Sequence, residues 1–138
     1  MSVGAKTGSL SEVEIARLRD LRLGLLRLHK SLLNMEQQDF EKMFGRLSSG
    51  ELLQLVINHA QFAWLRMVSA LVVEIDELLN GDEPAAVSDF QELLSQAQSL
   101  LTSSRDEAFN TRYQAALQRD PAVVMAHADV MQLLRRDD

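Results

Sequence analysis

The stretch Phe62–Leu79, with the sequence FAWLRMVSALVVEIDELL, decides the fold of this chain. Wound at about 100° per residue, it is apolar around roughly two thirds of its circumference, which predicts a largely buried helix. Its narrow polar strip contains Arg66, Glu74 and Glu77. Asp76 falls outside this strip, on the apolar side. We therefore expect Asp76 to be a buried carboxylate with a partner, because an unpaired buried charge is costly.

Signals for helix starts recur along the whole chain. Serines at positions 11, 48, 88 and 104 are each followed three residues later by Glu or Gln, the pattern of a capping box. Asp120-Pro121 adds a start with an acidic N-cap and proline at the first helical position. Gly45 and Asn80-Gly81 are typical of helix ends. No segment alternates like a strand, so the sequence predicts an all-α protein.

These signals give six expected helices. Their approximate bounds are Glu12–Phe44, Ser49–Ile57, Gln61–Leu79, Pro84 or Asp89 to Leu101, Arg105–Gln118 and Pro121–Leu134. Short connections favour antiparallel neighbours, so we expect an antiparallel helical bundle of about four longer helices with one or two short ones. Residues 1–10 are predicted to be a flexible N-terminal tail, and residues 11–138 a single helical-bundle domain.

Composition excludes several classes of protein. The chain has 138 residues, no cysteine and a net charge of −6. Without cysteine there is no disulfide and no thiolate site, which favours a reducing cytoplasm. The negative charge opposes binding to a phosphate backbone, so we expect no nucleic acid partner. We also expect no membrane span, because the longest apolar run contains Arg66 and ends in acids.

Charge is distributed unevenly along the chain. Between Arg66 and Arg105 there are seven acids and no Lys or Arg, whereas the first helix is rich in basic residues. Such complementarity can set the register of helices within a bundle or across a dimer. The alternative is that a protein partner docks on the acidic region 74–92.

Polar groups interrupt the apolar faces of three expected helices. His29 and Glu36 lie in an apolar row of the first helix, and His127 projects from the stripe of the last. Together with Asp76 they form a candidate buried polar cluster, which Ser69 and Trp64 could join as hydrogen-bonding neighbours of Asp76. Lys30 or Arg27 could instead reach that carboxylate. The simplest interpretation is a hydrogen-bond network that specifies which helices pair. An imidazole beside a carboxylate would also titrate near neutral pH.

Two histidines and a carboxylate are also ligand types for zinc, iron or manganese. The spacing does not support a metal centre, because neither Glu-x-x-His nor His-x-x-x-His occurs. No phosphate loop, dinucleotide fingerprint, nucleophile elbow or zinc-protease motif is present either. We therefore assign no metal ligands, no cofactor and no catalytic residue from the sequence.

Five short segments resemble a group of small all-helical bacterial proteins that have no assigned activity. The segments are Leu28–Lys30, Phe40–Glu41, Leu52–Leu55, Phe62–Arg66 and Ile75–Glu77. Where those proteins often have a proline after the arginine and an Asp-Pro pair before the phenylalanine, this chain has Met67 and His59-Ala60. The resemblance covers roughly positions 25–80. It implies a bacterial cytoplasmic protein and carries over no catalytic residue.

The function that follows is a non-enzymatic, self-associating interaction protein. A first helix of about 33 residues would be roughly 50 Å long, too long for a compact domain of this size unless it bends or overhangs. An overhang would expose apolar surface, which predicts a homodimer. The alternative is a metal- or small-ligand-binding bundle, conceivably an oxidoreductase, that uses His29, Asp76 and His127.

Overall fold

The computed structural model describes residues 9–135, and the part it describes is all-helical. This confirms the predicted all-α class. The helices are α2 (Glu12–Phe44), α3 (Ser49–Asn58), α4 (Ala60–Ala63), α5 (Arg66–Asn80), α6 (Val87–Ser103), α7 (Glu107–Arg119) and α8 (Pro121–Leu134). Most of the predicted N-terminal tail lies outside the described residues. Of its last two residues, Ser9 forms an isolated bridge with Ala86 and Leu10 packs against the core.

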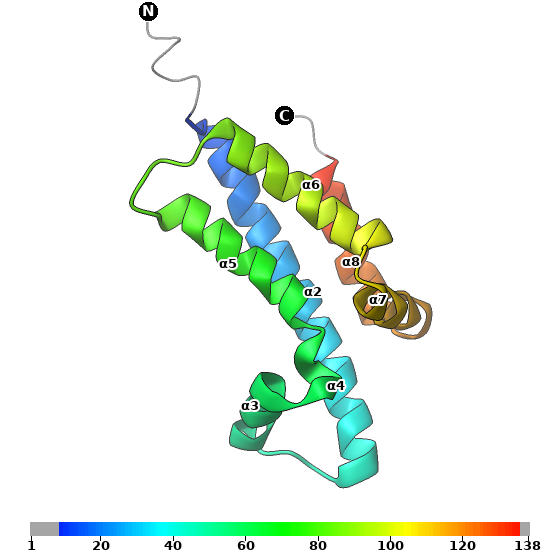
Figure 1. The fold of residues 1–138 in the computed structure, drawn as a ribbon. Coiled ribbons are helices and arrows are strands. Elements are labelled where there is room, and N and C mark those ends of the chain that lie inside the picture. Colours follow the sequence, from blue (N-terminus) through cyan, green and yellow to red (C-terminus); the bar gives the residue numbers. More distant parts are fainter. Residues whose placement is uncertain (1–8, 136–138) are drawn as a thin grey trace, which may run out of the picture.

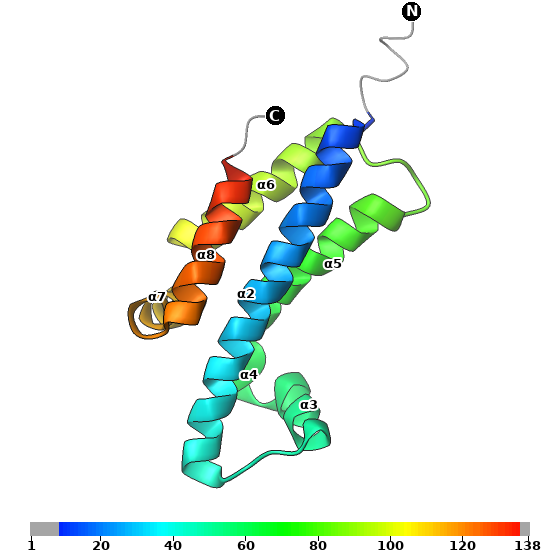
Figure 2. The same cartoon turned by 180° about the vertical axis from the view of Figure 1, so that it is seen from behind.

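Helix α2 forms the spine of the molecule (Figure 1). Its capping box is as predicted, because the Ser11 hydroxyl accepts from the amide of Glu14 and the Glu14 carboxylate accepts from the amide of Ser11. One stripe of α2 is buried at the spacing of a single helical face, and it consists of Leu18, Leu21, Leu25, Leu28, Leu32 and Met35. Helices α5 and α8 pack along this spine, and α6 lies against both of them (Figures 1 and 2).

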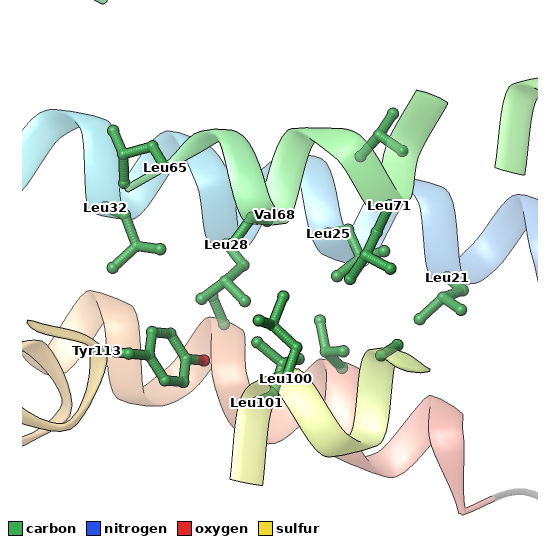
Figure 3. Packing of buried hydrophobic residues seen from close by; sticks show 14 of the residues in the cluster. Leu21, Leu25, Leu28, Leu32, Leu65, Val68, Leu71, Leu100, Leu101 and Tyr113 are labelled. Carbon is green, nitrogen blue, oxygen red and sulfur yellow. The ribbon is translucent and has the colours of Figure 1, made fainter. Parts of the chain in front are cut away.

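The buried apolar residues form one cluster. Leucines of α2 meet Leu65, Val68 and Leu71 on one side and residues of α6, α7 and α8 on the other, as Figure 3 shows. Within the described chain, no helix is long and apolar enough to cross a membrane.

Helices α2 and α8 approach each other closely at Gly24. A Cβ atom at this position would lie 3.2 Å from the side chains of both Leu133 and Val130. Because glycine has no side chain, the sequence predicts that a first helix of this length bends most easily at Gly24 and Gly45. The structure instead gives the missing side chain a packing role, because it makes room for α8 in the middle of a 33-residue helix.

The predicted helix Gln61–Leu79 is wrong in one respect, since it is interrupted. A turn at Trp64-Leu65 separates α4 from α5. His59 is the N-cap of α4, and its Nδ1 accepts from the amide of Gln61 at 3.0 Å. In this turn the amide of Leu65 donates to the backbone oxygen of Phe62, three residues earlier, so Phe62 does not continue the angular spacing of α5.

Two of the predicted helix starts are displaced. Ser88 is not an N-cap, because α6 begins after Ala86, whose amide donates to the Asp89 carboxylate. Ser104 is not one either, because Asp106 caps α7 by accepting from the amide of Phe109. An acidic side chain can accept from free backbone amides at the start of a helix, as a serine can. Asp89 does so in α6 and Asp106 in α7. The starts at positions 11, 48 and 120 are confirmed.

The far end of α2 projects beyond α5 and α8 together with α3 (Figures 1 and 2). We call residues 37–58 the arm. No residue of the arm is buried, although α3 is apolar on one face. Glu41 shapes the connection between the two helices by accepting from the amide of Leu47 at 2.9 Å, and α2 ends at Gly45, whose φ of 91° suits a residue without a side chain.

Candidate functional site

The buried polar centre of the molecule is the carboxylate of Glu36. It is the one buried charged residue between positions 9 and 135, with 6% of its surface exposed. One carboxylate oxygen accepts from the indole Nε1 of Trp64 at 2.6 Å, and the other accepts from the Gln61 side chain at 3.2 Å. Arg112 of α7 approaches to 3.8 Å. Three elements and the turn at Trp64 therefore meet at this carboxylate.

This arrangement explains how a charge can remain in the core. A buried carboxylate is tolerated where it is paired and accepts hydrogen bonds, and here it receives two of them and faces a cation. Gln61 and Trp64 are three residues apart, so both project from the same side of the short α4 turn towards α2. The site fixes the position of α4 and α7 on the spine.

Tyr113 and His127 form a second polar contact, between α7 and α8. The buried Tyr113 hydroxyl lies 2.6 Å from Nδ1 of His127. Burial raises the pKa of Tyr113, so the phenol keeps its proton at neutral pH. Burial also lowers the pKa of His127, and the nearby charge of Arg135 lowers it further.

Aromatic rings connect the two polar sites. Trp64 contacts Phe109 with ring centroids 5.5 Å apart, Phe109 stacks on Tyr113 at 5.3 Å, and Tyr113 contacts the His127 ring at 5.5 Å. The chain of rings runs from the turn before α5 through α7 to α8. It packs the turn before α5 against α7 and α8, which come more than forty positions later in the chain.

Asp76 is not the buried carboxylate that the sequence predicts. Its side chain is 42% exposed and accepts from Arg22 of α2 at 2.6 Å. The buried stripe of α5 consists of Val68, Leu71, Val72 and Ile75. Asp76 stands at the edge of this stripe, where an arginine from the neighbouring helix can reach it while both remain in contact with water.

The remaining members of the predicted cluster are dispersed. The Ser69 hydroxyl donates to the backbone oxygen of Arg66 within its own helix. His29 is half-buried on α2, and its burial lowers the pKa of the imidazole. The structure therefore brings Glu36 and Trp64 together and leaves His29, Ser69, Asp76 and His127 in other surroundings. Among residues 9–135, no group of three or more His, Asp or Glu side chains is arranged to hold a metal ion.

Sequence reasoning missed Gln61, Arg112, Tyr113 and Arg22 as polar partners. The spacing of Gln61 and Trp64 was a signal that could have been used, since residues three apart share a helix face. Arg112 and Tyr113 lie on a different helix from their partners. Only the packing of α7 reveals those contacts.

The surface of the described residues has several hollows. A groove of about 510 Å³ lies between the end of α2 and α3. A longer groove follows α5 and α6, where hollows of about 360, 380 and 430 Å³ share lining residues. The acidic region 74–92 supplies carboxylates to this second groove.

Comparison with known proteins provides no relative. The chain matches no protein-family model, no curated protein and no solved structure.

Proposed function

We propose that this chain is a non-enzymatic, self-associating interaction protein built on an antiparallel bundle of its longer helices. Its proposed setting is the bacterial cytoplasm, which the resemblance of positions 25–80 and the lack of cysteine support. The proposed assembly is a homodimer formed through the arm. A protein partner for the acidic region 74–92 is the second part of the proposal.

The observation that carries this proposal is the apolar surface of the arm. Met43 and Phe44 at the end of α2 are 76% and 69% exposed, and Leu53 and Ile57 on α3 are 57% and 50% exposed. These four large side chains lie within fifteen positions of one another in the chain. Several large apolar side chains exposed in one short segment favour a protein interface, whereas single exposed apolar residues are ordinary.

The shape of the arm also supports docking of a second copy. The groove between the end of α2 and α3 has Phe40, Phe44 and Leu55 among its lining residues. Glu41 holds the connection between the helices, and Arg66 donates to the backbone oxygen of Ile57 at the end of α3. The surface is therefore formed before association, which lowers the entropic cost of binding. A two-fold axis would place the arm of one copy against the arm of the other.

Self-association is tested by light scattering and sedimentation with two matched variants. Met43→Lys places a charge on the arm, and Met125→Lys places the same charge on α8 at a methionine that is 70% exposed. We expect the wild type to form dimers at micromolar concentration. Met43→Lys should weaken dimerisation by about tenfold or more, because a lysine would be desolvated in the interface, and Met125→Lys should leave it unchanged.

A wild type that stays monomeric at about 100 μM, well above the range of stable homodimers, would overturn the proposed self-association. Equal losses in the two variants would show that the interface is not the arm. Circular dichroism of both variants verifies that each remains helical.

A further inference from the structure

The groove between α5 and α6, called here the α5–α6 groove, runs along both helices. The helices are joined by the loop 81–86 and lie side by side (Figure 1). Three hollows follow one another along them, and Gln96 lines all three. Glu74 lines the hollows of about 360 and 380 Å³. Met67 and Leu100 line the hollows of about 380 and 430 Å³, which lie farther from the loop. The three hollows are therefore parts of one continuous groove.

The end of the groove near the loop is acidic. Glu74, Glu77, Asp89 and Glu92 line it, and all four are exposed. Within residues 9–135, Asp89 accepts from a backbone amide and Glu92 from Gln96, but no ion pair neutralises any of the four. The sequence has no Lys or Arg between positions 66 and 105, so neither helix supplies a cation to this end. The result is a local negative potential without an internal counter-charge.

Farther from the loop, apolar and polar side chains line the groove together. Met67, Ala70, Leu71 and Leu100 line the middle hollow. Arg105 stands at the far end, beyond Leu100. Arg66 and Asp106 also line this part, so the four carboxylates near the loop have no equivalent at the far end, and this difference would fix the direction of an elongated occupant.

The lining residues repeat at helical spacing on both walls. On α5 they fall at positions 66, 67, 70, 71, 74, 77 and 78, and on α6 at positions 89, 92, 93, 95, 96, 99 and 100. Two helical walls of 15 and 17 residues are about 22 and 25 Å long at 1.5 Å per residue. Ridges of a third helix can lie in such a groove, which favours a helical occupant of about 15 residues.

We propose that the α5–α6 groove binds a basic amphipathic helix of a partner protein. The apolar face of that helix lies on Met67, Leu71 and Leu100. Its Lys or Arg residues lie at one end, against Glu74 and the other three carboxylates. This inference rests on the proposed partner of the acidic region 74–92 and names its chemistry, and it is independent of dimerisation through the arm.

A second copy of the chain is the less suitable occupant. The exposed face of α2 carries Arg19, Arg27 and Lys30, but α2 lies behind α5 and α6 in the view of Figure 1 and in front of them in Figure 2. Copies joined in this way would contact each other head to tail and would not close as a dimer. A separate basic helix meets no such restriction.

The test uses a labelled synthetic helix as probe, measured by fluorescence anisotropy below the concentration at which the protein dimerises. The probe has about 15 residues, leucine at helical spacing on one face and three lysines in the turns at one end. We expect saturable binding that weakens as salt is added. Two control peptides have either the lysines replaced by glutamate or the leucines moved off the common face, and neither should bind.

Matched variants of the protein locate the binding. Glu74→Lys reverses a charge in the groove, whereas Asp129→Lys does so at an exposed position of α8. Ala70→Gln places a polar side chain on the groove floor, whereas Ala128→Gln does so on α8. We expect Glu74→Lys to weaken probe binding about tenfold and Ala70→Gln about fivefold, with both α8 variants within about twofold of wild type.

Three results would overturn the proposal. The first is that the probe fails to bind, and the second is that it binds as well when its lysines are glutamates. The third is that the α8 variants lose as much affinity as the groove variants. Glu74→Lys abolishing self-association in sedimentation would also overturn it, because the groove would then bind a second copy. Failure of dimerisation alone, with probe binding intact, would overturn the proposed arm interface and leave the groove assignment standing.

Discussion

The indole nitrogen of Trp64 lies 2.6 Å from a carboxylate oxygen of Glu36, and this contact joins the turn before α5 to the spine helix α2. The chain's single tryptophan thus donates to its one buried charged side chain within residues 9–135. A short hydrogen bond to a carboxylate is stronger than one between neutral groups. The contact fixes where the interrupted helix α4–α5 meets α2.

Removal of the Glu36 carboxylate should destabilise the fold strongly. Glu36→Ala leaves the Trp64 N–H without its acceptor, and we expect a loss of about 2–4 kcal/mol in the free energy of unfolding. Glu36→Gln keeps an acceptor oxygen and should lose less than half as much. Urea denaturation followed by Trp64 fluorescence measures both values. Gln38→Ala, at an exposed position of the same helix, is the control, and a loss equal to that of Glu36→Ala would contradict the role of the carboxylate.

Asp76 should matter little for stability. The sequence predicts a buried carboxylate whose loss would cost about 3–5 kcal/mol. In the structure, Asp76 and Arg22 are 42% and 37% exposed, and partly exposed pairs contribute only about 0.5 kcal/mol. We therefore expect Asp76→Ala and the exposed Glu77→Ala to have similar small effects in urea denaturation. A loss above about 2 kcal/mol for Asp76→Ala alone would restore the original expectation.

Stability should fall as the pH is lowered from 7 to 5. Burial lowers the pKa of both His29 and His127 in the folded state, whereas in the unfolded chain a histidine has its ordinary pKa of 6.5. The unfolded state therefore takes up protons first below pH 6.5, and stability declines from there until the folded-state pKa is passed. His127→Gln should reduce this decline and Gln132→Ala on the same helix should not, as measured by melting temperature against pH. An unchanged slope in His127→Gln would count against a buried neutral imidazole.

The close approach of α2 and α8 should not tolerate a larger residue at position 24. Gly24→Val adds a branched side chain where even a Cβ atom would lie 3.2 Å from Leu133 and Val130. Overpacking of this kind costs about 1–3 kcal/mol. Gly24→Ala should be milder, because alanine also favours the helix by up to about 1 kcal/mol. The melting temperatures of both variants, measured by thermal unfolding, show which of them is less stable. A Gly24→Val protein as stable as wild type would show that α8 can move away freely.

The length of α2 illustrates what could be read from sequence. Its bounds, Glu12–Phe44, and its capping box at Ser11 follow from local chemistry and are confirmed. The bounds of α8 follow in the same way from Asp120-Pro121. Capping groups and periodic apolar residues act over one or two helical turns, so the chain encodes them locally. The displaced starts of α6 and α7 show the limit of the same reasoning, because several nearby polar side chains compete to cap one helix.

The sequence by itself determined the all-helical class, the main helix ends and the presence of polar groups within apolar faces. Tertiary structure decided which of those groups are buried and what they contact. Glu36 is buried because Trp64, Gln61 and Arg112 converge on it from other elements, whereas Asp76 is half-exposed because α5 turns it towards Arg22 at the edge of the core. A helical wheel gives the direction of a side chain around its own axis. Only the positions of neighbouring helices decide whether that direction leads to solvent or to a partner.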